Sequence, residues 1–519
     1  MTLGRLLRAA SRGTVKAALY LAGLVAAVLL TIVVVFAVQA RVRLPDLQPW
    51  HRIALAEEFR ADRPGAPKTF AEYLALEERL FAELRRRVFD DPKVADRAPT
   101  GRYNPAAVPG RLALGTRYNR SYELVHSQPR GAVLLMHGLT DSPYSVRALA
   151  EIFHARGYYV LALRMPGHGT VPAGLLDTEW TDWYAAVELA ARHAAARAPG
   201  KPFYAGGYST GAPLAALLAV RGLEDPTLPR PTRLFLVSAA IGVSEFAALA
   251  NIASALSFLP GFEKAKWLDV LPEYDPYKYN SFTVNAGNQV FQLTRALHRE
   301  LAAAAAKETL DRMPRVTAFQ SVVDSTVNAA EVIRGFMLRL PGPGNELVAF
   351  DVNGSDSWAG LVAPGPREAY AQLRDARALP FRLLTVANRA PDSSEMAIST
   401  REAGSTEWRS EPLGLAWPPS VFSVGHVALP FTLDDPVYGL TPAPAGALTW
   451  TIGDLAARGE SGALAVPLGM FARLRSNPFF AVIRARVEAA LDADERRCAP
   501  RSRSSASTSP PRRGARSPA

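Results

Sequence analysis

Short apolar runs alternate with helix-forming segments along the middle of the chain. The apolar runs cover residues 131–138, 158–169, 201–209 and 232–241, and the helical segments cover 144–156, 181–197 and 212–221. Strands that alternate with helices in this way are typical of a parallel sheet wrapped by helices. The pattern therefore predicts an α/β fold whose first part spans residues 131–241.

Two stretches interrupt this alternation. Residues 242–312 form a mixed, aromatic-rich stretch that ends in a strong helix at 288–308. Residues 353–420 are again irregular, with one strand-like run at 381–388, and a last amphipathic helix at 477–491 completes the core. We expect the two stretches to be insertions that separate further core segments at 313–352 and 421–493.

The chain begins with a long apolar segment. Residues 17–40 contain no charged side chain over 24 positions, which exceeds the ~20 residues that a helix needs to span a bilayer. Residues 1–16 are basic, which favours a cytoplasmic N-terminus and export of the residues beyond the apolar segment. We expect an uncleaved, single-pass transmembrane signal anchor in the inner (cytoplasmic) membrane, with the rest of the chain on the periplasmic side. The alternative is export and then cleavage near Ala40.

Residues 41–130 lie between this segment and the α/β pattern. Apolar residues recur near helical spacing over residues 70–89. We expect this region to pack on the core or to form a membrane-proximal stalk. Nothing in its composition indicates chemistry.

The net charge of +11 is confined to the two ends of the chain. Residues 1–16 hold four basic side chains, residues 496–519 hold seven arginines, neither segment holds an acid, and the remainder sums to zero. A nucleic-acid partner calls for a basic face on the folded body, so we expect none. The tail at 494–519 is rich in Ser, Pro and Arg, and is predicted to be disordered.

Cysteine and histidine usage limits the possible chemistry. Cys498 is the only cysteine, so an intramolecular disulfide or a thiolate metal site is not possible. No pair of His or Cys residues has the spacing of zinc ligands. We therefore expect neither a metal nor another cofactor.

The segment Gly207-Tyr208-Ser209-Thr210-Gly211 comes after a strand-like run and precedes a helix-forming one. A Gly-x-Ser-x-Gly pattern in this strand–turn–helix setting is typical of the nucleophile elbow of an α/β-hydrolase. The flanking Gly207 and Gly211 allow the tight turn that exposes the serine hydroxyl above the sheet. Ser209 is therefore the candidate nucleophile, and an ordinary glycine-rich loop is the alternative.

An earlier strand ends in His137-Gly138-Leu139. In the α/β-hydrolase fold the loop after this strand gives one backbone N–H to the oxyanion hole, and the residue after the nucleophile gives the other. Leu139 and Thr210 are the predicted donors. His137 is expected to shape the loop without titrating.

The base and the acid are predicted from the chain order Ser, acid, His of this fold. Only His298 and His426 come after Ser209, and His298 lies inside the predicted Ala-rich helix. His426 is therefore the predicted base. Asp324, after a strand-like run, is the favoured acid, and Asp392, closer to His426 along the chain, is the alternative.

Four segments now carry a family resemblance: LLMHGLTDSPYS, RMPGHG, GGYSTGA and SVVDSTV. Together they resemble the serine hydrolases of the monoacylglycerol lipase and lysophospholipase group, in the α/β-hydrolase superfamily. The resemblance covers residues 130–340 well and 420–490 loosely. It implies an α/β-hydrolase fold, a mostly parallel sheet flanked by helices, with residues 242–312 as the cap over the site. It assigns the nucleophile, acid and base roles to Ser209, Asp324 and His426, although the long insertion before His426 departs from the family.

The resemblance also implies a reaction. It is hydrolysis of a carboxylic ester through an acyl-enzyme, by a Ser-His-Asp triad. The signal anchor suggests a lipid-like ester substrate met at the membrane, such as a lysophospholipid or a monoacylglycerol. The alternatives are an aminopeptidase-like amide hydrolase on the same fold and a catalytically inactive, membrane-anchored binding protein.

Overall fold

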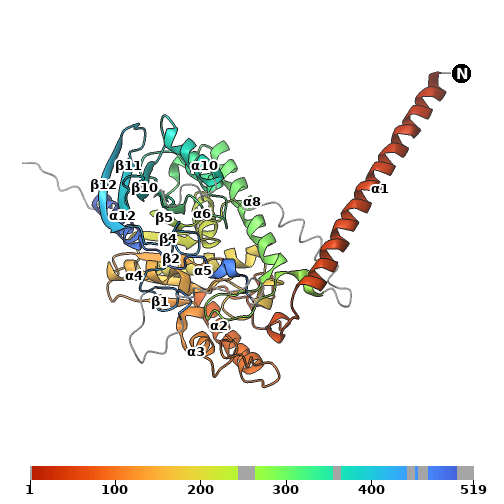
Figure 1. Cartoon of the computed structure of the whole chain (residues 1–519), viewed down its shortest axis with the longest axis horizontal. Helices are drawn as coiled ribbons and strands as arrows, with labels where there is room; N and C mark the ends of the chain where they lie inside the picture. The colour runs from red at the N-terminus through yellow and green to blue at the C-terminus, as the bar shows by residue number, and fades with distance from the viewer. Residues whose placement is uncertain (1–2, 243–262, 355–363, 441–450, 454–465, 499–519) are drawn as a thin grey trace, which may run out of the picture.

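The computed structural model describes residues 3–242, 263–354, 364–440, 451–453 and 466–498. Its centre is a mostly parallel sheet covered by helices (Figure 1), which confirms the predicted α/β class. The strands are β1 (Tyr122–Leu124), β2 (Ala132–Met136), β3 (Tyr159–Leu163), β4 (Phe203–Tyr208), β5 (Arg233–Val237), β8 (Arg315–Ser321), β9 (Glu346–Phe350), β10 (Arg382–Asn388), β11 (Glu395–Arg401) and β12 (Trp408–Ala416). A separate small hairpin pairs β6 (Trp267–Asp269) with β7 (Phe282–Thr283).

The strand order places two loops together. The order is β1-β3-β2-β4-β5-β8-β9-β10-β11-β12, and all neighbours from β3 to β10 are parallel. The chain passes from β2 to β3 on one side and then returns to β4 on the other side of β2. Ligands of open α/β sheets bind at such a switch point, beyond the carboxyl ends of the strands. The loops after β2 and β4 therefore meet where a site is expected.

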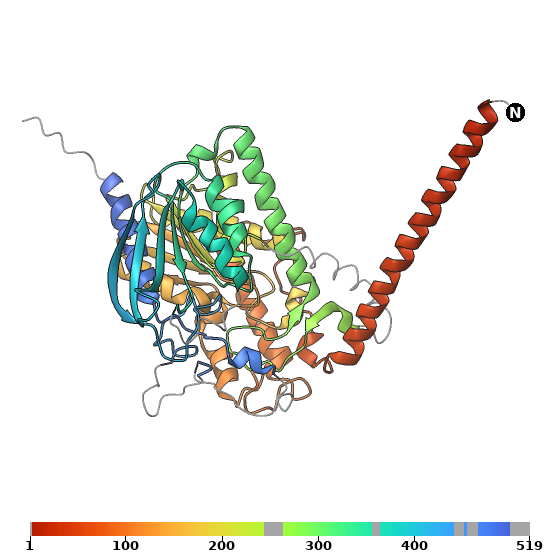
Figure 2. The same ribbon diagram turned by 45° about the horizontal axis from the view of Figure 1, so that its top comes forward.

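Helices cover both faces of the sheet. The α-helices of the described body are α2 (Phe70–Leu84), α3 (Val108–Gly115), α4 (Arg147–Ala155), α5 (Trp180–Ala196), α6 (Gly211–Arg221), α8 (Val284–Ala306), α9 (Ala329–Glu331), α10 (Pro364–Asp375), α11 (Leu468–Phe471) and α12 (Phe480–Cys498). Alternate residues of β2 point to opposite faces: Leu134 joins the core under α5, α6 and α8, and Val133 joins the core under α4 and α12. Figure 2 shows α8 and α12 on opposite sides of the sheet.

The structure corrects both predicted insertions. The predicted cap is residues 242–312, of which 243–262 lie outside the described residues. Helix α8, also in this range, belongs to the core instead, because its apolar side packs on α6 and α5. A parallel connection from β5 to β8 needs such a covering helix. Residues 382–416, inside the predicted second insertion, extend the sheet: β10 pairs parallel with β9, and β11 and β12 are added as antiparallel strands.

The N-terminal helix α1 (Leu3–Arg43) projects from the body (Figure 1). Its segment Val15–Ile32 has a mean hydropathy of 2.2 and none of it is buried against the protein. By length and composition this segment is able to cross a membrane, although a signal sequence at this position has the same properties.

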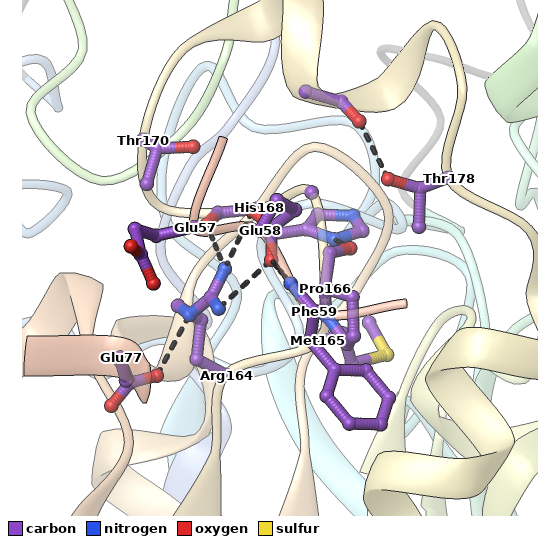
Figure 3. A network of polar contacts seen from close by, with 12 residues as sticks. Glu57, Glu58, Phe59, Glu77, Arg164, Met165, Pro166, His168, Thr170 and Thr178 are labelled. Carbon is purple, nitrogen blue, oxygen red and sulfur yellow. Dashed lines mark hydrogen bonds and ion pairs between the residues drawn. The ribbon is translucent and has the colours of Figure 1, made fainter. Parts of the chain in front are cut away.

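Residues after α1 pack on the core, so they are no free stalk. Phe59, Phe70 and Tyr73 belong to the same buried cluster as the sheet. A buried ion network joins this region to the loop after β3 (Figure 3): the Arg164 Nε atom donates to Glu77 Oε1 at 2.7 Å, and its Nη2 atom donates to Glu58 Oε1 at 3.1 Å.

Loss of the Arg164 charge is expected to destabilise the fold strongly. The guanidinium is 0% exposed, so Arg164→Met leaves two buried carboxylates without their cation. Breaking a buried ion pair in this way typically costs about 3–5 kcal/mol. Arg79→Met is the matched control, because Arg79 pairs with Glu57 at the surface and such pairs contribute about 1 kcal/mol or less. Denaturant unfolding of the full chain in detergent micelles measures both, and equal losses would contradict the expectation.

Candidate active site

Ser209 lies in a strained turn between β4 and α6. Its φ angle is +52°, a left-handed value that a non-glycine residue rarely adopts and that is often kept at functional sites. Two backbone hydrogen bonds hold the turn: Ser209 N donates to Val237 O at 2.9 Å, and Ala240 N donates to Ser209 O at 3.1 Å. The neighbouring strand β5 therefore fixes the geometry that presents the serine.

The two glycines of the motif are required by close packing. A Cβ at Gly207 would lie 2.1 Å from the carbonyl carbon of Gly211, and a Cβ at Gly211 would lie 2.2 Å from Met136 O. Both distances are far below van der Waals contact. The glycines thus let the first turn of α6 press against β4 and β2, which is a different reason from the backbone freedom expected from the sequence.

His426 and Asp324 are in direct contact. The His426 Nδ1 atom lies 2.8 Å from Asp324 Oδ2, with the two side chains 4% and 0% exposed. The other carboxylate oxygen, Oδ1, accepts backbone N–H bonds from Thr326 at 2.9 Å and Val327 at 3.0 Å. Because an ionised carboxylate only accepts, Nδ1 carries the proton, and Nε2 keeps the lone pair that a general base needs.

The same imidazole lies beside the nucleophile turn. The rings of Tyr208 and His426 are 5.3 Å apart, and Tyr208 precedes Ser209 in the turn. The backbone carbonyl of His426 accepts bonds from the Tyr208 hydroxyl at 3.4 Å and from Ser238 Oγ at 3.5 Å. The structure therefore brings the loop of His426 to the carboxyl ends of β4 and β5.

The other candidates lie elsewhere. Asp392 is exposed in the turn between β10 and β11. His298 lies on α8, where its Nε2 contacts the backbone carbonyl of Ile241 at 3.1 Å. Since β10, β11 and β12 occupy the chain between Asp324 and His426, the long separation of these two residues reflects added strands of the sheet.

The loop after β2 contacts the nucleophile turn. A Cβ at Gly138 would lie 3.1 Å from Ser209 Cβ and 3.1 Å from Tyr208 Cδ1. Leu139 comes directly after it in this loop, and Thr210 begins the helical turn after Ser209. The backbone amides of the two predicted oxyanion donors thus belong to the two segments that meet at Ser209.

His137 holds this loop in place. Its Nε2 atom accepts the backbone N–H of Met165 at 3.0 Å, so its Nδ1 atom donates to Gly138 O at 2.8 Å. Burial lowers the pKa of His137 well below its usual value, which keeps the ring neutral. Tyr279, which lies between β6 and β7, also holds this loop, because its backbone N–H donates to Thr140 O at 2.8 Å.

Two residues of the site were not predicted from the sequence. The Gln320 side chain donates to Asp324 Oδ2 at 2.9 Å and so helps to orient the carboxylate. Asp141 is buried beside Gly138 and pairs with Lys278 Nζ at 3.4 Å. The position of Asp141 directly after the sequence HGLT could have indicated it as a site residue. Its partner Lys278, however, is 137 positions away, and no sequence pattern links the two. Among the described residues, no group of three His, Cys, Asp or Glu side chains is arranged to hold a metal ion.

The fold and the arrangement of these residues define an α/β-hydrolase domain. Residues 127–335 match the family model described as "Serine aminopeptidase, S33". A thermostable monoacylglycerol lipase of Bacillus sp. (strain H-257) is 46% identical over 56 residues, which are 11% of this chain and 22% of the relative. The chain thus matches about a fifth of the length of this curated relative. Residues 127–335 are therefore similar to the α/β-hydrolases of this family, and a shorter stretch is similar to a monoacylglycerol lipase.

Solved structures with similarity to the chain include three lipolytic enzymes. A structure from a study of the metagenome-derived enzymes LipS and LipT has a TM-score of 0.34 at 24% identity, covering 49% of this chain and 96% of that one. The monoacylglycerol lipase of Paleococcus ferrophilus has a TM-score of 0.32 at 18% identity, covering 45% and 89%. A soluble variant of the Saccharomyces cerevisiae monoglyceride lipase has a TM-score of 0.34 at 16% identity, covering 44% and 82%.

Proposed function

We propose that this protein is a membrane-anchored serine hydrolase that cleaves carboxylic esters of lipid-like molecules. The observation that carries the proposal is the 2.8 Å contact between His426 and Asp324 beside the strained turn of Ser209. A buried imidazole with a fixed tautomer beside the turn that presents a serine is the arrangement used for acyl transfer.

The reaction proceeds in two steps. Ser209 Oγ attacks the ester carbonyl while His426 Nε2 takes its proton, and Asp324 stabilises the imidazolium that forms. The backbone N–H groups of Leu139 and Thr210 bind the oxyanion. His426 then returns the proton to the leaving alcohol, and a water molecule activated by the same imidazole hydrolyses the acyl-enzyme.

The location proposed for the protein is the inner membrane, with α1 as a single span and the hydrolase domain on the periplasmic side. The segment after α1 is docked on the domain: Leu44 O accepts a bond from Lys264 Nζ at 2.8 Å, and Leu47 packs in a cluster with Trp267 and Val270. This short connection supports a domain held close to the bilayer surface. Cleavage near Ala40 is the alternative, and protease protection of the N-terminus in spheroplasts distinguishes the two.

An ester chain-length series tests the proposed substrate. We expect kcat/KM to rise at least about 10-fold from acetyl to long-chain acyl glycerol esters, because each methylene removed from water contributes about 0.8 kcal/mol. Turnover is measured with the full chain in detergent micelles, with aminoacyl amides in the same panel because the matching family model is described as a serine aminopeptidase. A sharp preference for short, soluble esters, or for amides, would contradict the lipid-ester assignment.

A further inference from the structure

A narrow, partly open crevice next to the nucleophile turn is lined by two cationic side chains. Tyr208 on its wall precedes Ser209, and Val427 comes after His426, so the crevice adjoins both reacting groups. Lys278 lies between β6 and β7, and Arg475 lies between α11 and α12, so the two cations are far apart in the sequence. The lining residues are Asp141, Tyr208, Lys278, Val427, Phe431, Tyr438 and Arg475.

The positive charge of this crevice is only partly neutralised. Lys278 pairs with Asp141 at 3.4 Å and keeps 30% of its side chain exposed. Burial raises the pKa of Asp141, and the ammonium group of Lys278 opposes this shift. Among the described residues Arg475 makes no ion pair, and its Nη2 atom donates to the backbone carbonyl of Met470 at 3.5 Å. Arg473, exposed nearby in the sequence, donates to Thr326 Oγ1 at 3.0 Å.

The other carboxylates around the crevice already have partners. Asp324 binds His426. The Asp275 carboxylate accepts the Tyr438 hydroxyl at 2.7 Å and the backbone N–H groups of Tyr277 and Lys278 at 2.9 and 3.1 Å. Asp435 pairs with Arg147 at 3.0 Å. A cation in a half-buried wall that lacks a full counter-charge attracts an anion from solution, and a guanidinium binds carboxylate or phosphate oxygens with two donors.

We infer that Lys278 and Arg475 form a subsite for an anionic group, phosphate or carboxylate, carried by the ester substrate near its scissile bond. This inference rests on the proposed ester hydrolysis and makes it more specific. It favours acylglycerols with a charged head group over neutral monoacylglycerols. It disfavours a peptide amino terminus, whose ammonium group these two cations would repel.

The test compares three oleoyl esters of glycerol on the full chain in detergent micelles. One ester is neutral, one carries a phosphate and one carries a hemisuccinate carboxylate. The wild-type protein is expected to prefer one or both charged esters, and the preferred ester identifies the anion. Arg475→Met is expected to lower kcat/KM for the charged ester by about 10- to 100-fold, mainly through KM, and to leave the neutral ester within about 3-fold. Lys278→Met should lower kcat/KM for the charged ester more than for the neutral one, and some loss on both follows because buried Asp141 also loses its cation.

The controls separate this inference from the proposed function. Lys307→Met removes an exposed cation at the end of α8, where it pairs with Glu224 after α6. It should change the turnover of neither the charged nor the neutral ester. Lys278→Arg should keep the preference for the charged ester. Equal losses on charged and neutral esters, or no wild-type preference, would overturn the subsite. If no ester is turned over, the proposed function fails, and binding of the phosphate ester to Ser209→Ala protein still decides on the subsite.

Discussion

Ser209→Ala is expected to abolish ester hydrolysis, with a fall in kcat of about 10⁴- to 10⁶-fold. The substitution removes the only atom that forms the acyl bond, while His426, Asp324 and the oxyanion amides stay in place. The fold should be unaffected, because alanine lacks only the hydroxyl and meets the same backbone strain as serine at the φ of +52°. Steady-state turnover and covalent labelling by a fluorophosphonate probe measure the effect.

The matched control for this prediction is Ser127→Ala, at an exposed position away from the turn. It should retain full turnover and full labelling. Labelling or turnover that persists in folded Ser209→Ala protein would show that another residue is the nucleophile. A wild-type protein that is folded but never labelled would instead favour the inactive binding protein as the alternative.

Short sequence patterns are sufficient to predict the strands and helices that such patterns mark. The strand–turn–helix pattern around Ser209 predicts β4 and α6 to within one residue or two. Parallel strands are buried on both faces and form continuous apolar runs, which is why β2, β3 and β5 are found from composition alone. The sequence also predicts that the loop after β2 lies beside Ser209. The close approach of Gly138 to Ser209 in the structure agrees with this prediction.

Contacts between segments that are far apart in the sequence are harder to predict. β11 and β12 are antiparallel strands with much exposed surface, so they lack the apolar run that marks the central strands, and their sequence resembles an insertion. The sequence pattern places α8 in the cap because its neighbours along the chain are irregular, whereas its packing on α6 decides its place. The pair Asp141–Lys278 depends on a contact between the loop after β2 and the cap segment, and no local pattern encodes it.

The identity of the acid is tested by Asp324→Asn, for which we expect kcat to fall about 10⁴-fold. In the structure Oδ1 of Asp324 accepts two backbone N–H bonds, from Thr326 and Val327. The asparagine oxygen must therefore take this position, and its NH₂ group faces His426 Nδ1. That group donates where the carboxylate accepted, so the imidazole proton moves to Nε2 and the base that should receive the Ser209 proton is lost.

Asp392→Asn is the matched comparison, since the same substitution is made at the other candidate acid. Asp392 is exposed in the β10–β11 turn, so kcat is expected to stay within about 2-fold, as for most surface substitutions. Fluorophosphonate labelling rates of both variants report the reactivity of Ser209 independently of substrate binding. A large loss in Asp392→Asn together with a retained rate in Asp324→Asn would reverse the assignment. It would also require the β10–β12 extension to move towards His426, because the exposed turn offers no contact to the imidazole as it stands.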